Sequence, residues 1–134
     1  MEYKKSYKGL ILWVFLFCFA MFGCAFLPIE NEGILMSLVM NVCCWCIVLL
    51  TYIIYRTENI YWYNGITFEV AEKAGTQTRK DYAWEHLRLF SKFALYYTAY
   101  SVIAHLLRIN SFIDIAVMVV GLTVVAVCTM KIKL

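Results

Sequence analysis

Residues 33–55 have the sequence GILMSLVMNVCCWCIVLLTYIIY, and this stretch determines the class of the protein. It contains no charged residue and is dominated by Leu, Ile, Val, Met and Cys. A helix needs about 20 mainly apolar residues to cross the hydrocarbon core of a bilayer, because each residue adds about 1.5 Å to its length. The stretch is therefore predicted to be a transmembrane helix.

The composition of the whole chain leads to the same class. Of its 134 residues, 63% are hydrophobic and 16% are charged, whereas a soluble domain has about 45–50% and about 25%. The mean hydropathy is +0.73. A soluble domain of this size cannot bury so much apolar side chain. These values exclude a soluble globule, a disordered chain and a compact nucleic-acid-binding module, and the lipid bilayer is the expected partner.

Three further stretches resemble residues 33–55 in length and hydropathy. The predicted spans are residues 9–29, 33–55, 89–109 and 112–130, with residues 56–88 as the one long polar loop. The predicted fold class is all-α: a polytopic membrane protein, folded as an antiparallel bundle of four transmembrane helices with an amphipathic helical cytoplasmic loop. The whole chain, 1–134, is predicted to be a single transmembrane domain.

The positive charges predict the orientation of these spans. All of the 12 Lys and Arg residues except Arg108 lie before the first span, in or beside the long loop, or after the fourth span. Because Lys and Arg are concentrated on the cytoplasmic side of membrane proteins, both termini and the loop are expected to be cytoplasmic, an N-in/C-in topology. The bacterial cytoplasmic membrane is the expected location.

Small and polar residues predict which helix faces are in contact. In lipid no hydrophobic effect drives helices together, so small and polar side chains mark their interfaces. In the third span such residues recur at steps of three and four: Ser91, Ala94, Thr98, Ser101, His105 and Arg108. This stripe is the expected contact face of that span. Small residues on the other spans, such as Ala20, Gly23 and Gly121, suggest a homo-oligomer.

Four polar residues are expected to cluster within the outer half of the membrane: Asn41, His105, Arg108 and Asp114. The spacer between the third and fourth spans is very short, so these spans form a tight hairpin. Ionisable residues inside a membrane are candidates for functional sites. Two interpretations remain open: Arg108 and Asp114 form an ion pair bridged by His105, or the cluster is a proton- or ligand-linked site.

The long loop carries signals for two helices. Thr67 is expected to cap a short helix, and Thr78 with Asp81 is expected to start a second helix that continues into the third span. The loop is either a solvated connector with an amphipathic foot on the membrane or a docking surface for a protein partner.

No catalytic, cofactor-binding or metal-binding residue is predicted, and no cofactor. Cys43 and Cys46 form a CxxC pair, but their expected position near the middle of the bilayer disfavours exchange with a partner thiol. His86 and His105 are expected near opposite membrane faces, so they cannot share a zinc ion. Phosphate-binding and hydrolase motifs are absent from the sequence, and a non-enzymatic function is favoured.

Two segments of the loop, YNGIT at 63–67 and RKDYAWEHL at 79–87, resemble the SdpI-like small bacterial membrane proteins and related short membrane proteins of unassigned function. The sequence departs from that pattern at Thr67, where the family carries Arg. The resemblance implies immunity to a secreted toxin, or signalling through a bound regulator. It nominates a loop interaction motif of four residues: Asn64, Gly65, Trp84 and His86. Without the resemblance, Asn64 and Gly65 are expected to form a turn, and Trp84 and His86 are expected to anchor the loop at the membrane interface.

The sequence therefore predicts a non-enzymatic integral membrane protein that acts through interactions with another membrane or cytosolic component, in toxin immunity or envelope signalling. The alternative is a transporter or channel subunit with a polar pocket in the outer half of the membrane. A membrane redox protein that uses Cys43 and Cys46 is a third interpretation.

Overall fold

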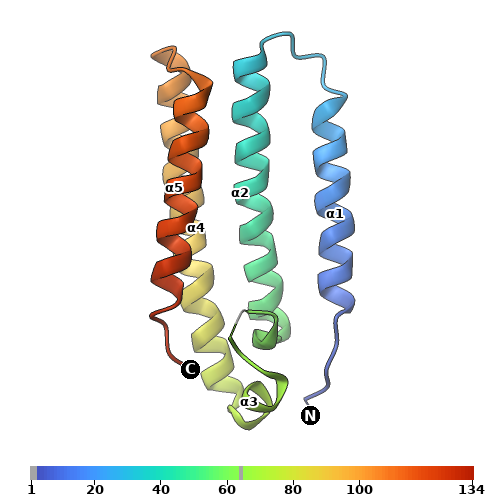
Figure 1. Ribbon diagram of the computed structural model, residues 1–134. Helices are drawn as coiled ribbons and strands as arrows, with labels where there is room; N and C mark the ends of the chain where they lie inside the picture. The colour runs from blue at the N-terminus through green and yellow to red at the C-terminus, as the bar shows by residue number, and fades with distance from the viewer. Residues whose placement is uncertain (1–2, 64) are drawn as a thin grey trace.

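The computed structural model describes residues 3–63 and 65–134, and over these residues the protein contains helices and no strand. Four long helices lie side by side (Figure 1): α1 (Lys8–Ala25), α2 (Glu32–Thr57), α4 (Thr76–Leu106) and α5 (Ser111–Thr129). A 3-10 turn, η1 (Ile60–Trp62), and a short helix, α3 (Phe68–Lys73), join α2 to α4. Both termini lie at one end, here called the termini end, and the α1–α2 and α4–α5 turns form the opposite hairpin end (Figure 1).

Helices α1, α2 and α5 are each long and apolar enough to cross a membrane. Their outward surfaces are also apolar: on α1, Phe15, Phe19 and Phe22 are 70%, 81% and 69% exposed. Contiguous apolar surface of this kind is unfavourable in water and favourable in hydrocarbon. The all-α class and the membrane character predicted from the sequence are thereby confirmed.

Helix α4 is the longest helix and is more polar than the other three. It runs without a break from Thr76 to Leu106, so the predicted continuity between the loop helix and the third span is confirmed. Its start differs from the prediction, because Gly75 rather than Thr78 occupies the N-cap position. Tyrosine, hydroxyl and charged side chains lower its hydropathy, and α4 is not among the three helices that could cross a membrane by length and composition.

Helix α2 is central to the packing, because it contacts α4 most extensively and also contacts α1 and α5. In the half of α4 nearer the hairpin end, four side chains are buried: Ala94, Tyr97, Ser101 and Ala104. Ala94 and Ser101 belong to the predicted small-residue stripe. Tyr97 and Ala104 do not, so the observed contact face is rotated relative to the predicted one. Helix α5 approaches α4 closely at Gly121, where an added Cβ atom would lie 2.3 Å from Cε2 of Phe93. Glycine allows this approach because it has no side chain.

The described part of the segment between α2 and α4, residues 58–63 and 65–75, folds back as a compact cap over the termini end. Helix α3 begins after Thr67, whose hydroxyl accepts a hydrogen bond from the backbone N–H of Val70 at 3.3 Å, as predicted. Tyr61 ties the cap to the N-terminal segment, because its hydroxyl donates to the carbonyl of Ser6 at 2.6 Å. The loop is thus packed tertiary structure rather than an open connector.

Candidate functional site

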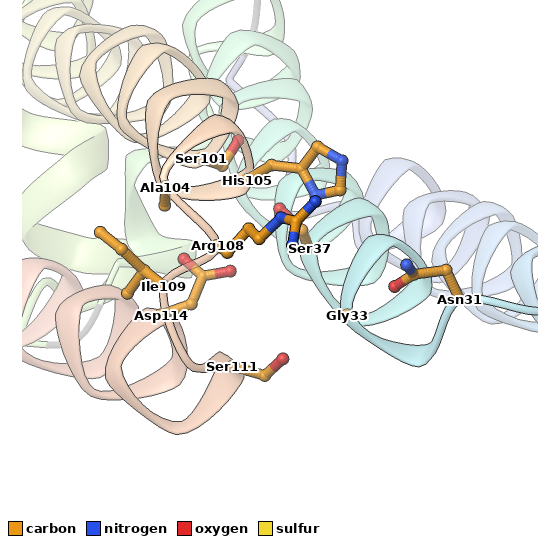
Figure 2. A pocket seen from close by; sticks show the side chains of 10 residues that line it. All are labelled: Asn31, Gly33, Ser37, Ser101, Ala104, His105, Arg108, Ile109, Ser111 and Asp114. Carbon is orange, nitrogen blue, oxygen red and sulfur yellow. The ribbon is translucent and has the colours of Figure 1, made fainter.

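A polar pocket with a volume of about 440 Å³ opens at the hairpin end between α2, α4 and α5. Figure 2 shows the side chains that line it. Three members of the predicted cluster line the pocket: His105, Arg108 and Asp114. Most of the remaining wall consists of small residues: Gly33, Ser37, Ser101, Ala104 and Ser111. The short side chains leave room at the level where the ionisable groups converge.

Arg108 is held in an unusual backbone conformation at the end of α4. The N–H of Ile109 donates to the carbonyl of Ala104 at 2.9 Å, and the N–H of Arg108 donates to that of His105 at 3.1 Å. This pair of bonds is a Schellman motif, which places Arg108 at the position that glycine usually occupies. Its φ of 54° is left-handed, a conformation that costs a non-glycine residue about 1 kcal/mol. The strain is offset by the helix-ending hydrogen bonds, and the guanidinium is positioned at the pocket.

The Asp114 carboxylate does not pair with Arg108. Asp114 is buried, and the hydroxyl of Tyr97 donates a hydrogen bond to its Oδ1 at 3.0 Å. Its position in the first turn of α5 also favours a negative charge there, because of the helix dipole. In Figure 2 the Arg108 guanidinium extends away from this carboxylate, toward the α2 side of the pocket. Within residues 3–63 and 65–134 no ion pair joins the two, so the Arg108–Asp114 pair of the first interpretation is not formed.

Asn41, the fourth member of the predicted cluster, lies in the seam between α2 and α4. Its amide donates to Ser101 Oγ and to the carbonyl of Ser37, both at 2.9 Å. Its Oδ1 accepts from Thr98 Oγ1 at 2.8 Å. Asn41 lines a neighbouring groove of about 420 Å³ rather than the pocket itself. Asn41 therefore takes part in helix–helix contact, and it shares this groove with His105 but not with Arg108 or Asp114.

A packed cluster lies on the same three helices as the pocket, α2, α4 and α5. Cys44, Ala94, Tyr97 and Met118 are buried together, with Phe93 and other apolar side chains packed against them. Tyr97 belongs both to this cluster and to the hydrogen bond with Asp114. A close-packed cluster leaves no continuous water path.

All six cysteines, which lie within the described residues, are free thiols. Cys43 Sγ lies 3.7 Å from Met21 Sδ on α1, whereas its neighbour Cys44 packs into the buried cluster. Residues 3–63 and 65–134 contain no group of three His, Cys, Asp or Glu side chains that could hold a metal ion.

The three described residues of the predicted loop motif, Gly65, Trp84 and His86, do not form one surface. His86 is buried, bonded through Nδ1 to the carbonyl of Tyr82 at 2.9 Å and stacked on Tyr63 at 4.2 Å between ring centroids. Burial lowers the pKa of His86, although the Tyr82 carbonyl and Glu85 act in the opposite direction. Gly65 and His86 line the same cavity on the termini side. Trp84 is instead half-exposed and packs on Tyr55, with 5.6 Å between the ring centroids. Asn64 lies outside the described residues.

Arg79 holds the cap together, a role that the sequence did not reveal. Its side chain is 8% exposed and donates to Glu58 Oε2 at 2.9 and 3.1 Å. It also donates to the carbonyls of Ala71 and Ala74 and lies 4.1 Å from the ring centroid of Tyr3. Burial raises the pKa of Tyr3 to about 12, although Arg79 acts in the opposite direction. The sequence carries no signal that pairs Arg79 with Glu58, which lies 21 residues away along the chain.

Comparison with known proteins adds no relative. The chain matches no protein-family description, no curated protein and no solved structure at a significant level.

Proposed function

We propose that all four long helices cross the membrane with both termini in the cytoplasm, in the cytoplasmic membrane of a bacterium. Helix α4 packs against α2 and α5, two helices that are apolar enough to cross a membrane. Its polar side chains need not face lipid, because Tyr97 and Ser101 are buried against neighbouring helices. Eleven of the 12 Lys and Arg residues belong to the termini side of this topology, which follows the positive-inside rule.

The protein acts by binding another component rather than by catalysis, and the pocket at the hairpin end is its binding site. The observation that carries this proposal is the 440 Å³ polar recess with Arg108 and His105 on its wall. Within residues 3–63 and 65–134 the guanidinium of Arg108 has no hydrogen-bonding or ion-pair partner, so its five donors remain available. A guanidinium with free donors matches a carboxylate or a phosphate. The expected ligand is a small acidic molecule, or the acidic end of a peptide, presented from outside the cell.

This function suits a protein of toxin immunity or envelope signalling, the processes that the SdpI-like resemblance implies. A transporter would use the same recess as an entrance. The buried cluster around Cys44 and Tyr97 lies on the same helices, and its close packing favours binding over conduction.

The topology is tested by cysteine labelling in intact cells. Asn31→Cys at the hairpin end and Gln77→Cys at the start of α4 would each be treated with a membrane-impermeant maleimide. Peptide mass spectrometry then separates each new thiol from the six native ones. Labelling at position 31 and protection at position 77 until the cells are opened is the expected result. The reverse pattern, or labelling of both sites in intact cells, would contradict the topology.

The acidic-ligand site is tested with Ser37→Cys, which places a thiol on the pocket wall. The rates of modification by an anionic and a cationic methanethiosulfonate reagent would be compared. Arg108→Gln should lower the anionic-to-cationic rate ratio about fivefold, because a unit charge several Å away in a partly hydrated site contributes about 0.5–1 kcal/mol with opposite sign for the two reagents. Arg108→Lys should retain most of the ratio. A ratio unchanged by Arg108→Gln would show that the guanidinium does not control the pocket.

A further inference from the structure

Another hollow lies on the surface of the molecule, at the contact between α2 and α4. This α2–α4 groove has a volume of about 680 Å³, and its walls come from residues 45–52 of α2 and 84–95 of α4. Most of its lining residues are apolar or aromatic. Three aromatic side chains line it: Trp45, Tyr52 and Trp84, which are 43%, 47% and 48% exposed. Apolar and aromatic side chains that remain this exposed need an apolar occupant.

Two cations lie beside this apolar lining. Arg88 and Lys92 both line the groove and are one helical turn apart on α4. Glu85 lies 3.8 Å from Arg88, but both side chains are about half-exposed, and such pairs contribute little. Lys92 has no ion-pair partner within residues 3–63 and 65–134. A positive charge therefore stands next to an apolar groove, and its complement is an anion with an apolar tail.

We propose that the α2–α4 groove binds one anionic phospholipid of the cytoplasmic leaflet. Its phosphate contacts Arg88 and Lys92, and an acyl chain lies along the groove toward Trp45. The leaflet follows from the four-span topology proposed above, in which Trp84 and Arg88 lie at the cytoplasmic interface. From Trp84 to Leu95 the α4 wall extends about 16 Å, close to the ~15 Å half-thickness of the hydrocarbon core. Lys92 reaches the headgroup by extending its flexible stem along the helix.

Native mass spectrometry of the purified full chain tests this site. The protein would be released from micelles that contain equimolar dioleoyl phosphatidylglycerol and dioleoyl phosphatidylcholine. The expected result is one retained phosphatidylglycerol, preferred about tenfold over phosphatidylcholine, because each nearby Lys or Arg favours an anionic lipid. Arg88→Gln with Lys92→Gln should reduce the preference to near unity. Lys8→Gln with Lys131→Gln removes two exposed cations from the same end of the molecule, but not from the groove, and should leave it unchanged.

A groove-filling variant and a competitor separate this site from other occupants. Leu95→Trp should reduce the retention of both lipids, while circular dichroism verifies that the helices remain. Glycerol phosphate, which has the headgroup chemistry and no acyl chain, should not displace the lipid.

Four outcomes would overturn the site: equal retention of the two lipids, equal effects of the two double variants, displacement by glycerol phosphate, or a dimer that retains no lipid. Retention does not depend on which face of the membrane is outside. A failure of the proposed topology would therefore appear in the maleimide labelling and not in this measurement.

Discussion

Replacing Arg79 with glutamine should open the cap while leaving the long helices folded. The substitution removes a guanidinium that is 8% exposed and that donates two hydrogen bonds to Glu58. It also leaves the carbonyls of Ala71 and Ala74 without that donor. Breaking a buried ion pair by removing one partner costs about 3–5 kcal/mol. Glu58 is 19% exposed and keeps Lys80 at 3.7 Å, so the lower end, about 3 kcal/mol, is expected.

This loss of cap stability should appear as faster hydrogen exchange of the cap amides. A tenfold change in an equilibrium corresponds to about 1.4 kcal/mol, so the open form of the cap should become about 100-fold more populated. Hydrogen exchange of the backbone amides in residues 60–74, followed by mass spectrometry in detergent micelles at fixed pH, measures that population. Exchange in α1 and α2 should stay slow in the same samples.

Lys80→Gln is the matched control, because it removes the same charge from the neighbouring position. Lys80 is 45% exposed, and an exposed pair contributes at most about 1 kcal/mol. Its effect on cap exchange should stay below about fivefold. Equal effects of the two substitutions, or an Arg79→Gln cap that exchanges like the parent, would refute the role assigned to Arg79.

Three further predictions concern the packing and the cap. Gly121→Ala should lower the melting temperature in detergent, because the added Cβ overlaps Phe93 and overpacking costs about 1–3 kcal/mol. Gly23→Ala should leave the melting temperature unchanged, because no atom lies within 4 Å of the added Cβ, and equal melting temperatures of the two variants would contradict the close approach at Gly121. Asn41→Ala should destabilise by about 1 kcal/mol, as interhelical hydrogen bonds in membranes do; a neutral result in thermal unfolding would argue that the seam is hydrated. The cap should lose stability as the pH falls below about 6.5, because burial lowers the pKa of His86 and the unfolded chain then binds the proton more readily than the folded chain. His86→Gln should flatten this dependence of cap stability on pH, and an unchanged profile would exclude His86 as its source.

The membrane class and the positions of the apolar helices followed from the sequence alone. Hydropathy over about 20 residues is a local, additive property, so the predicted spans agree with α1, α2 and α5 to within a few residues at most ends. The Thr67 cap was also predictable, because an N-cap depends on residues within one turn. The grouping of His105, Arg108 and Asp114 followed from the short hairpin between two long helices.

The partners of these residues were decided by the tertiary structure. Helices that are apolar on every side carry no periodic signal that fixes their rotation about the axis, so the sequence could not show that Asp114 meets Tyr97 rather than Arg108. Nor could it show that Asn41 bonds to Ser101 across 60 residues, or that Arg79 meets Glu58 in the cap. Each of these contacts depends on the relative rotation and depth of two packed segments, and side-chain packing between them sets both.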